Sequence, residues 1–282
     1  MRKLIIGAAV LAIMALGTST FAQSTWGTDT TAVYKRDMFT LSLGAFVTGL
    51  DTSAKLDSSY GQGTTIDFEK VFGLSSNQTV FRADASWRFT PRQQLVFSYM
   101  QINRTGSNAL NASYVWGDTV YLAGLRAEAK WDTTQANVAY RFSFVQTDKG
   151  EFGGSIGVSY LQQKAALKGW AQVTGGANLQ YYAQTEATLE APVPVVGLFG
   201  TYEFTPALSL TGDIQYLDVT INDIKGKYTD ARLTLDYYPW RNVGFGVGYL
   251  YDKVVVDSTK SSWVGSVDYK FDGFLGYVSF RF

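Results

Sequence analysis

The residues of this chain that could do chemistry are charged side chains placed two apart within short alternating segments. In TVFRADASWRFT, residues 79–90, the charged residues Arg82, Asp84 and Arg88 alternate with apolar side chains. A β-strand puts successive side chains on opposite faces, so these three charges share one face. Because Arg82 and Asp84 are two apart, roughly 7 Å along a strand, we expect them to belong to one charge network.

Other alternating segments contribute charges to the same kind of face. The full predicted set, which would face the inside of a closed sheet, is Arg82, Asp84, Arg88, Arg141, Glu203, Asp213, Arg232, Asp236 and Arg281. Its cations and anions nearly balance. These side chains would either fill and brace a narrow interior, since buried charges must be paired, or line a small pore of weak charge selectivity. Small barrels hold little beyond their own side chains, which favours a filled or constricted lumen.

Residue types that are missing exclude most enzyme chemistry. The chain contains no histidine and no cysteine. Serine hydrolysis normally needs an imidazole or an equivalent base, and conventional zinc or copper sites need histidine or cysteine ligands. A carboxylate pair could still perform glycosidase-type catalysis, but no isolated pair stands out. We therefore predict no enzymatic activity, no catalytic residues, no metal and no cofactor.

The elements that must position the charges are β-strands joined as hairpins. Residues 79–89 alternate without a slip, Thr90-Pro91 breaks the pattern, and a second alternating run follows. The same form recurs around Pro206 and Pro239, each with an aromatic residue two positions earlier. Proline cannot donate a ladder hydrogen bond and so ends a strand. The rest of the chain to the C-terminus alternates in the same way.

The strands and their connections predict an all-β, closed, antiparallel up-and-down transmembrane barrel of about ten strands. Short turns alternate with long loops, which we place at Asp51–Gln78, Thr105–Ala129 and Leu167–Glu190. Short periplasmic turns and long extracellular loops are typical of outer-membrane barrels, and so are the abundant aromatic residues. Twelve strands remain an alternative if Asp51–Gln78 or Thr105–Ala129 contains a further hairpin. Open sheet edges are not tolerated in lipid, so the sheet must close.

The N-terminus predicts export. Arg2 and Lys3 precede an apolar run from Leu4 to Leu16, and a small-residue cleavage site ends at Ala22. This is the pattern of a signal peptide rather than a membrane-spanning helix. We divide the chain into a signal peptide (1–22), a periplasmic lead-in (23–36) and a barrel domain (37–282). The barrel domain and lead-in carry a net charge near −2, which gives no reason to expect nucleic acid as a partner.

Aromatic residues in predicted surface segments could mark a binding surface. Trp116, Trp170, Tyr181, Tyr182 and Trp263 lie in or near these segments. Exposed aromatic residues often mark binding; alternatively, they pack loop against loop or belong to the upper aromatic girdle.

Two further features bear on the lumen. The segment Ile66–Phe72 mixes Phe68 and Phe72 with charged residues and could fold inward as a partial plug. Glycines at 244, 246 and 248 fall on the lumen face, where they would leave room for a hydrophobic ligand.

The C-terminus and three internal blocks resemble known proteins. Phe274, Val278, Phe280 and Phe282 look like the terminal signal that barrel-assembly machinery recognises, with Gly276 a weak fit. The blocks TVFRADASWRFTPRQQLVFSY, PVPVVGLFGTYEFTPALSL and NVGFGVGYLYDK are similar to uncharacterised proteobacterial outer-membrane β-barrel proteins of the porin-like superfamily. The resemblance implies the fold and no particular activity.

From these observations we expect an outer-membrane barrel of a Gram-negative bacterium with a structural or small-solute permeability role. Surface recognition or adhesion through the extracellular loops is the main alternative, and hydrophobic-ligand transport is a weaker one. We expect a monomer whose partners are outer-membrane lipid and lipopolysaccharide, with the barrel-assembly machinery as a partner during biogenesis.

Overall fold

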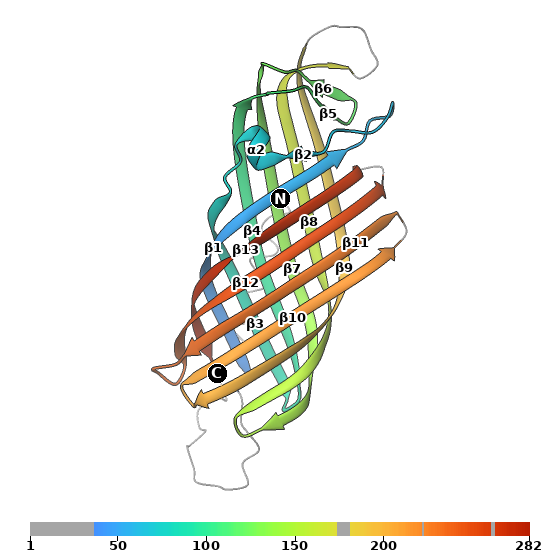
Figure 1. Cartoon of the computed structure of the whole chain (residues 1–282). Coiled ribbons are helices and arrows are strands. Elements are labelled where there is room, and N and C mark those ends of the chain that lie inside the picture. The colour runs from blue at the N-terminus through green and yellow to red at the C-terminus, as the bar shows by residue number, and fades with distance from the viewer. Residues whose placement is uncertain (1–36, 174–180, 222, 261–262) are drawn as a thin grey trace, which may run out of the picture.

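The chain folds as a closed ring of antiparallel strands (Figure 1). The computed structural model describes residues 37–173, 181–221, 223–260 and 263–282. The predicted signal peptide and lead-in lie outside the described residues. Each ring strand pairs with its neighbours in sequence, and the last strand pairs with the first, from Thr40 opposite Arg281 to Leu56 opposite Gly265. The described residues thus form a barrel with the up-and-down topology predicted above.

The described part of the chain confirms ten strands in the ring. They are β1 (Phe39–Leu56), β3 (Asn77–Thr90), β4 (Gln93–Ala109), β7 (Arg126–Thr147), β8 (Gly150–Val173), β9 (Tyr181–Thr205), β10 (Leu208–Ile221), β11 (Ile224–Tyr237), β12 (Val243–Lys260) and β13 (Trp263–Arg281). The segment predicted as a possible further hairpin does contain one, formed by β5 (Tyr114–Trp116) and β6 (Thr119–Tyr121). It attaches to the end of β8 through β6 and does not enter the ring, so the twelve-strand alternative is wrong.

The connections differ strongly between the two ends of the barrel. At the end that holds the C-terminus, β3–β4, β7–β8 and β9–β10 are joined by two residues each. At the opposite end, the connection between β1 and β3 contains β2 (Ile66–Asp67) and the short helix α2 (Phe68–Phe72), and the β4–β7 connection contains the β5–β6 hairpin. This asymmetry assigns the first end to the periplasm and the second to the outside of the cell. No helix among the described residues is long and apolar enough to cross a membrane.

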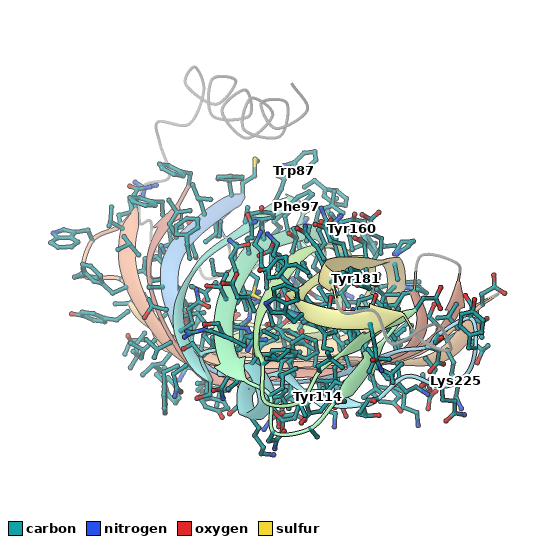
Figure 2. The ribbon with its side chains drawn as sticks, turned by 90° about the horizontal axis from the view of Figure 1, so that it is seen from above. Trp87, Phe97, Tyr114, Tyr160, Tyr181 and Lys225 are labelled. Carbon is teal, nitrogen blue, oxygen red and sulfur yellow. The ribbon has the colours of Figure 1, made fainter. Side chains whose placement is uncertain are left out.

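We call the half of the barrel next to the periplasmic end the lower half and the other the upper half. The lower half presents an apolar outer surface. Outward side chains there include Phe81, Trp87, Phe152, Ile156 and Phe245, all between 47% and 62% exposed. In the view along the barrel, Trp87 lies outside the ring (Figure 2). Apolar side chains exposed around a closed barrel form the band that contacts lipid.

Polarity inverts between the lower and upper halves of the same strands. On β7, Val138 and Phe144 point outward and Arg141 points inward, as in a membrane barrel. Higher on the same strand, Lys130 is exposed and Trp131 is fully buried inside. The same exchange occurs along β1, β4, β8, β12 and β13. The upper half is therefore built like a water-soluble barrel, with a polar outside and an apolar core.

This inversion explains why the predicted loops were too long. The segment Leu167–Glu190 was predicted as a loop, but β8 continues to Val173 and β9 begins at Tyr181. Likewise β1 continues past Asp51 to Leu56, and β4 past Thr105 to Ala109. When apolar residues change from the outer to the inner face, the two-residue pattern loses its phase and resembles irregular structure, although the strand continues.

An aromatic core fills the upper half. Trp116, Trp131, Trp263, Phe68 and Phe72 are all 0% exposed. Of the two alternatives for Trp116 and Trp263, packing rather than an exposed binding surface is found: their rings contact each other at 5.6 Å between centroids. The burial of Trp116 and Trp263 follows from the inversion, because apolar residues of the upper half face inward.

One interface of the ring is incomplete. β8 and β9 pair along their whole described length, from Gly150 opposite Tyr202 to Ala171 opposite Tyr181. β9 and β10 pair only from Leu208 up to Tyr216, which lies opposite Val196. Above this point β9 rises steeply while β10 runs obliquely, and the two strands separate (Figure 1). We call this separation the β9–β10 fork.

Candidate functional site

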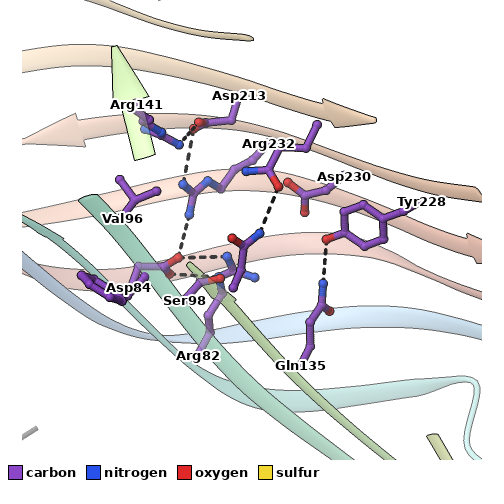
Figure 3. A pocket seen from close by; sticks show the side chains of 13 residues that line it. Arg82, Asp84, Val96, Ser98, Gln135, Arg141, Asp213, Tyr228, Asp230 and Arg232 are labelled. Carbon is purple, nitrogen blue, oxygen red and sulfur yellow. Dashed lines mark hydrogen bonds and ion pairs between the residues drawn. The ribbon is translucent and has the colours of Figure 1, made fainter. Parts of the chain in front are cut away.

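The centre of the lumen contains a connected network of charges. Arg82 makes two hydrogen bonds to Asp84, through Nε and Nη2, both at 2.9 Å. Arg232 donates to Asp84 Oδ1 at 2.9 Å and to Asp213 Oδ2 at 3.3 Å. Its guanidinium therefore bridges two carboxylates that come from β3 and β10 (Figure 3).

Arg141 completes the network on the far wall. It forms an ion pair with Asp213 and lies over the Phe199 ring, 4.9 Å from the ring centroid. Five of the nine predicted residues are thus joined across the lumen: Arg82, Asp84, Arg141, Asp213 and Arg232. Two of these pairs, Arg232–Asp84 and Arg141–Asp213, brace the barrel cross-section, because each joins strands that are far apart in sequence.

The network leaves a cavity of about 30 Å³, which has room for about one water molecule. Gln135 and Asn137 line it, and the side-chain oxygen of each is buried and accepts no hydrogen bond from the described residues. A water molecule in the cavity would satisfy both acceptors. At this level charged and amide side chains occupy the described lumen.

The remaining predicted charges lie elsewhere. Arg88 pairs with Glu151 at 2.8 Å, and Asp236 accepts from the Tyr277 hydroxyl at 2.6 Å. Arg281 lies over the ring of Tyr238, 3.7 Å from its centroid. Glu203, at the periplasmic end of β9, is not joined to the central network by any ion pair among the described residues.

At the periplasmic mouth, Tyr238 lies in the connection between β11 and β12. Its hydroxyl is 2.8 Å from Ser279 Oγ. Burial raises the pKa of this hydroxyl to about 12, so it stays protonated at neutral pH.

Several functional residues were missed. Glu151 is 6% exposed and pairs with Arg88, while Asp230 lines the central cavity. Asp252 is fully buried and accepts from Gln135 Nε2 at 2.9 Å. A signal existed for both: Asp230 lies two positions from Arg232, which was assigned to the lumen, and Glu151 directly precedes the outward-facing Phe152 in an alternating segment. Asp252 lies where polarity inverts, and there the alternation gives no clear assignment.

The segment Ile66–Phe72 folds into the barrel. Asp67 caps α2 by accepting from the Lys70 amide at 2.9 Å, and Gly73 ends the helix in the left-handed region at φ 66°. Such an end favours glycine. Glu69 accepts from the Thr52 amide at 2.9 Å and pairs with the buried Arg104 of β4. These contacts fix α2 to two walls of the barrel.

The aromatic core closes the lumen above the charge network. The Phe68 ring of α2 lies 4.8 Å from that of Trp131 and 5.5 Å from that of Trp116. Trp131 Nε1 donates to Gln163 Oε1 at 2.7 Å, and Trp263 Nε1 donates to the Lys55 carbonyl at 3.1 Å. The described lumen is therefore blocked by two successive layers, one polar and one aromatic.

The glycines of β12 do not leave room for a ligand, contrary to the prediction. A Cβ on Gly246 would overlap the Tyr277 ring, and one on Gly244 would overlap the Tyr238 ring. These positions are glycine because two tyrosine rings occupy the space beside them.

Of the five aromatic residues predicted near surface segments, three are exposed at the extracellular end. Trp170 and Tyr182 lie opposite each other on β8 and β9, with ring centroids 6.2 Å apart. They are 48% and 60% exposed, and the adjacent Tyr181 is 38% exposed. We call Trp170, Tyr181 and Tyr182 the distal aromatic patch.

A carboxylate ties two extracellular connections together. Asp118, in the β5–β6 turn, accepts from the amide of Ser59 at 2.7 Å and from its hydroxyl at 3.0 Å. It also accepts from the Ser58 hydroxyl at 3.1 Å. These hydrogen bonds, the Ser59 amide foremost, hold the pKa of Asp118 below its usual value.

The residues of the predicted assembly signal lie on β13, beside β1 and β12, except Phe282, which directly follows that strand. Phe274 is 73% exposed and Phe282 59%, while Val278 and Phe280 are half-buried. Gly276 has open space where a Cβ would be.

Comparison with known proteins yields no family. No protein-family model matches the sequence, and no curated protein matches it either. Among solved structures, the toluene transporter TodX of P. putida is similar at 12% identity and a TM-score of 0.37, over 88% of this chain and 91% of that one. The monoaromatic hydrocarbon channel CymD is similar at 9% identity and a TM-score of 0.34, over 88% and 89%.

The attachment invasion locus protein Ail of Yersinia pestis is similar at 11% identity and a TM-score of 0.30, over 86% of this chain and 99% of that one. The assignment of this chain as an outer-membrane type of barrel rests on its own strand pairing and its apolar outer band, described above.

Proposed function

We propose that this protein is an outer-membrane barrel that acts by recognition at the cell surface rather than as an open pore. The observation that carries the proposal is the polarity inversion, because it gives a rigid extracellular barrel with its own aromatic core above a blocked membrane barrel. We refer to this upper half as the extracellular head. In this proposal the membrane barrel is an anchor, and the distal aromatic patch is the binding surface.

The chemistry of the patch favours stacking on a flat apolar surface. Trp170 and Tyr182 come from two strands that pair without a register shift, so their rings are held in place. Rigid aromatic side chains supply large contact areas at low entropic cost, which is why they dominate binding hot spots. A sugar ring of a surface polysaccharide or an aromatic side chain of a protein fits this description.

The first experiment records current through residues 23–282 refolded in a planar bilayer. A blocked lumen is expected to give no steady openings. The second experiment screens the refolded protein against immobilised polysaccharides and proteins and compares it with Trp170→Ala. Binding is expected to fall about tenfold or more, as hot-spot truncation typically costs 2 kcal/mol or more.

Trp240→Ala is the matched control for this screen. Trp240 is 60% exposed, but it lies in the β11–β12 connection at the periplasmic end. Its loss should leave binding unchanged. Equal binding by Trp170→Ala and the parent protein, or a large steady conductance, would contradict the proposal.

Small-solute permeability is the second candidate. It is favoured by the central cavity, whose unsatisfied acceptors on Gln135 and Asn137 call for water halfway along the lumen. Passage would require the bridge made by Arg232 to open and α2 to leave the upper half. Hydrophobic-ligand transport is less favoured, because the space beside Gly244 and Gly246 is filled.

A further inference from the structure

The β9–β10 fork leaves one edge of β9 without a partner strand. β8 pairs with β9 along the whole of Tyr181–Tyr202, whereas β10 reaches only as far as Val196. On the side facing the fork, no backbone partner for residues 182–190 occurs among the described residues. An unpaired strand edge is a template for pairing with another chain.

The direction of each amide on this edge can be assigned. The Glu203 amide donates to the Lys149 carbonyl at 2.7 Å, which lies on the β8 side of β9. Residues of a strand direct their backbone groups to alternate sides, and the β8–β9 register has no shift. Odd-numbered amides of β9 therefore face β8, and even-numbered amides face the fork.

Two prolines remove the edge donors closest to the membrane. Pro194 and Pro192 are the first even-numbered residues above Val196, and neither has an N–H. The outward row of β10 changes at this height from the exposed Tyr216 to the exposed Asp218, which marks the upper limit of the apolar band. Unpaired donors are most costly near lipid, so the prolines lie where an open edge is least tolerated.

Above the prolines the edge is intact. Residues 182–190 contain no proline and no glycine, and their ladder with β8 is continuous. Natural sheets blunt exposed edges with prolines, bulges or lysines. On this segment none of these is present, and five even-numbered positions can each offer a donor and an acceptor.

The side chains beside the edge define what would fit it. Glu186 and Glu190 are exposed on the outer face of β9, which itself contains no lysine or arginine. The nearest cations of this sheet, Lys164 and Lys168, lie on β8, on the side of β9 away from the fork. Across the fork, Asp218 is also exposed, and it forms an ion pair with Lys227 of β11. On the inner side, Val193 and Leu217 are partly buried against the aromatic core. An incoming strand would meet acidic groups outside and apolar groups inside.

We propose that the free edge of β9, from Tyr182 to Glu190, binds an extended segment of a partner protein as an additional antiparallel strand. The segment alternates basic side chains, which face Glu186 and Glu190, with apolar side chains, which face the interior. This edge shares only Tyr182 with the distal aromatic patch, and it binds through backbone groups, so its use does not depend on the aromatic side chains of that patch.

A second copy of this chain does not satisfy the geometry. Two barrels in one membrane have the same orientation, so their β9 strands run in the same direction. Their free edges cannot meet as an antiparallel ladder. The partner is therefore a different, extended chain on the outside of the membrane.

The test uses the full barrel in lipid nanodiscs and a fluorescent ten-residue peptide of alternating lysine and valine. Two matched peptides serve as controls: one with glutamate in place of lysine, and one with N-methyl groups on the amides along one edge. The lysine peptide should bind, and the glutamate peptide should not. N-methylation keeps every charge but blocks the ladder, so it should weaken binding about tenfold or more, since each lost hydrogen bond contributes about 1 kcal/mol.

Variants of the edge give an independent readout. The even-numbered Thr188 directs its amide to the fork, so Thr188→Pro removes an edge donor without removing a bond to β8. It should weaken binding about fivefold, whereas Thr188→Val should bind like the parent. The double variant Glu186→Gln, Glu190→Gln should bind more weakly and lose most of its salt dependence.

Equal binding of the N-methylated and unmodified peptides would overturn the proposal, because attraction would then be electrostatic only. Equal binding by Thr188→Pro and Thr188→Val would overturn it as well. If Thr188→Pro does not fold, as judged by heat modifiability, the peptide comparison on the parent barrel decides. Trp170→Ala should bind the peptide normally, which separates this result from the proposed role of the distal aromatic patch.

Discussion

Val196 of β9 lies opposite Tyr216 of β10, and this pair is the last one that joins the two strands. Continuing the register would place Pro194 opposite Asp218 and Pro192 opposite Thr220. Because the amides of these β9 positions would have to face β10, two consecutive rungs of the ladder lack a donor. The β9–β10 ladder thus ends at the point where two successive prolines would have to donate.

Replacing both prolines should extend the ladder. In a Pro192→Ala, Pro194→Ala double variant, the new amides can pair with β10, so they should exchange slowly with solvent deuterium. A Pro206→Ala variant, in the β9–β10 turn, is the control and should leave exchange near the fork unchanged. Rapid exchange at positions 192 and 194 would show that the prolines do not cause the separation.

Removing the bridging cation should loosen the central network. Arg232→Gln leaves Asp84 and Asp213 with one cationic partner each, and we expect a loss of about 1–3 kcal/mol in the free energy of unfolding. Lys227→Gln, which removes a surface pair with Asp218, should cost less than about 1 kcal/mol. Urea unfolding followed by tryptophan fluorescence measures both. A larger loss from Lys227→Gln than from Arg232→Gln would contradict the bracing role.

Adding a methyl group at two glycines of the last two strands should change the stability of the barrel by different amounts. Gly246→Ala would push against Tyr277, whose hydroxyl is held by Asp236, and should cost about 1–3 kcal/mol. Gly276→Ala adds a methyl group in open space and should be neutral or slightly stabilising. Equal thermal stability of the two variants would mean that the Tyr277 ring is not fixed.

The buried and exposed tryptophans should differ in their effect on stability. Trp131→Ala empties part of the aromatic core and should cost about 3–5 kcal/mol, as for other large-to-small core changes. Trp170→Ala, on the surface of the extracellular head, should change stability by less than about 0.5 kcal/mol. Heat modifiability on gels and chemical unfolding test this. Similar losses for both would argue against a packed upper half.

The tether made by Asp118 should depend on pH. The pKa of this carboxyl is lowered from 3.8, so the hydrogen bonds to Ser58 and Ser59 are fully present above that value and are lost as the pH falls through the lower, folded-state pKa. The amide resonance of Ser59 should shift with a midpoint below 3.8. Asp118→Asn should abolish the shift. A midpoint at or above 3.8 would show that the tether does not form in solution.

The ring and the faces of its lower half were predictable from the sequence. In segments such as residues 79–90, alternation alone places Arg82 and Asp84 inside and Phe81 outside. This works because one period and one polarity rule hold throughout the lipid-facing band. What alternation cannot give is the pairing across the lumen, such as Arg232 with Asp84, since that depends on the register of every strand between them.

The upper half was not predictable in the same way. The sequence places Trp116 and Trp263 near surface segments but leaves open whether they bind or pack, because above the lipid the inner face of the strands, and not the outer one, is apolar. Nothing local marks the height at which water replaces lipid as the surrounding solvent. Pro192 and Pro194 are visible in the sequence, but whether they interrupt a ladder depends on which edge of β9 they face, and that edge is known only from the strand pairing.

The polarity inversion also fixes how deeply the barrel sits in its membrane. If the barrel sank into the membrane by the length of two residues, groups such as Lys164 would move toward hydrocarbon at the upper boundary, and groups such as Phe152 would move toward the water at the lower boundary. The apolar row of β8 from Phe152 to Tyr160 spans roughly 26 Å along the strand, so it tolerates little hydrophobic mismatch. The polarity change along the strands therefore determines the immersion depth, and the extracellular head is held at a constant height above the lipid.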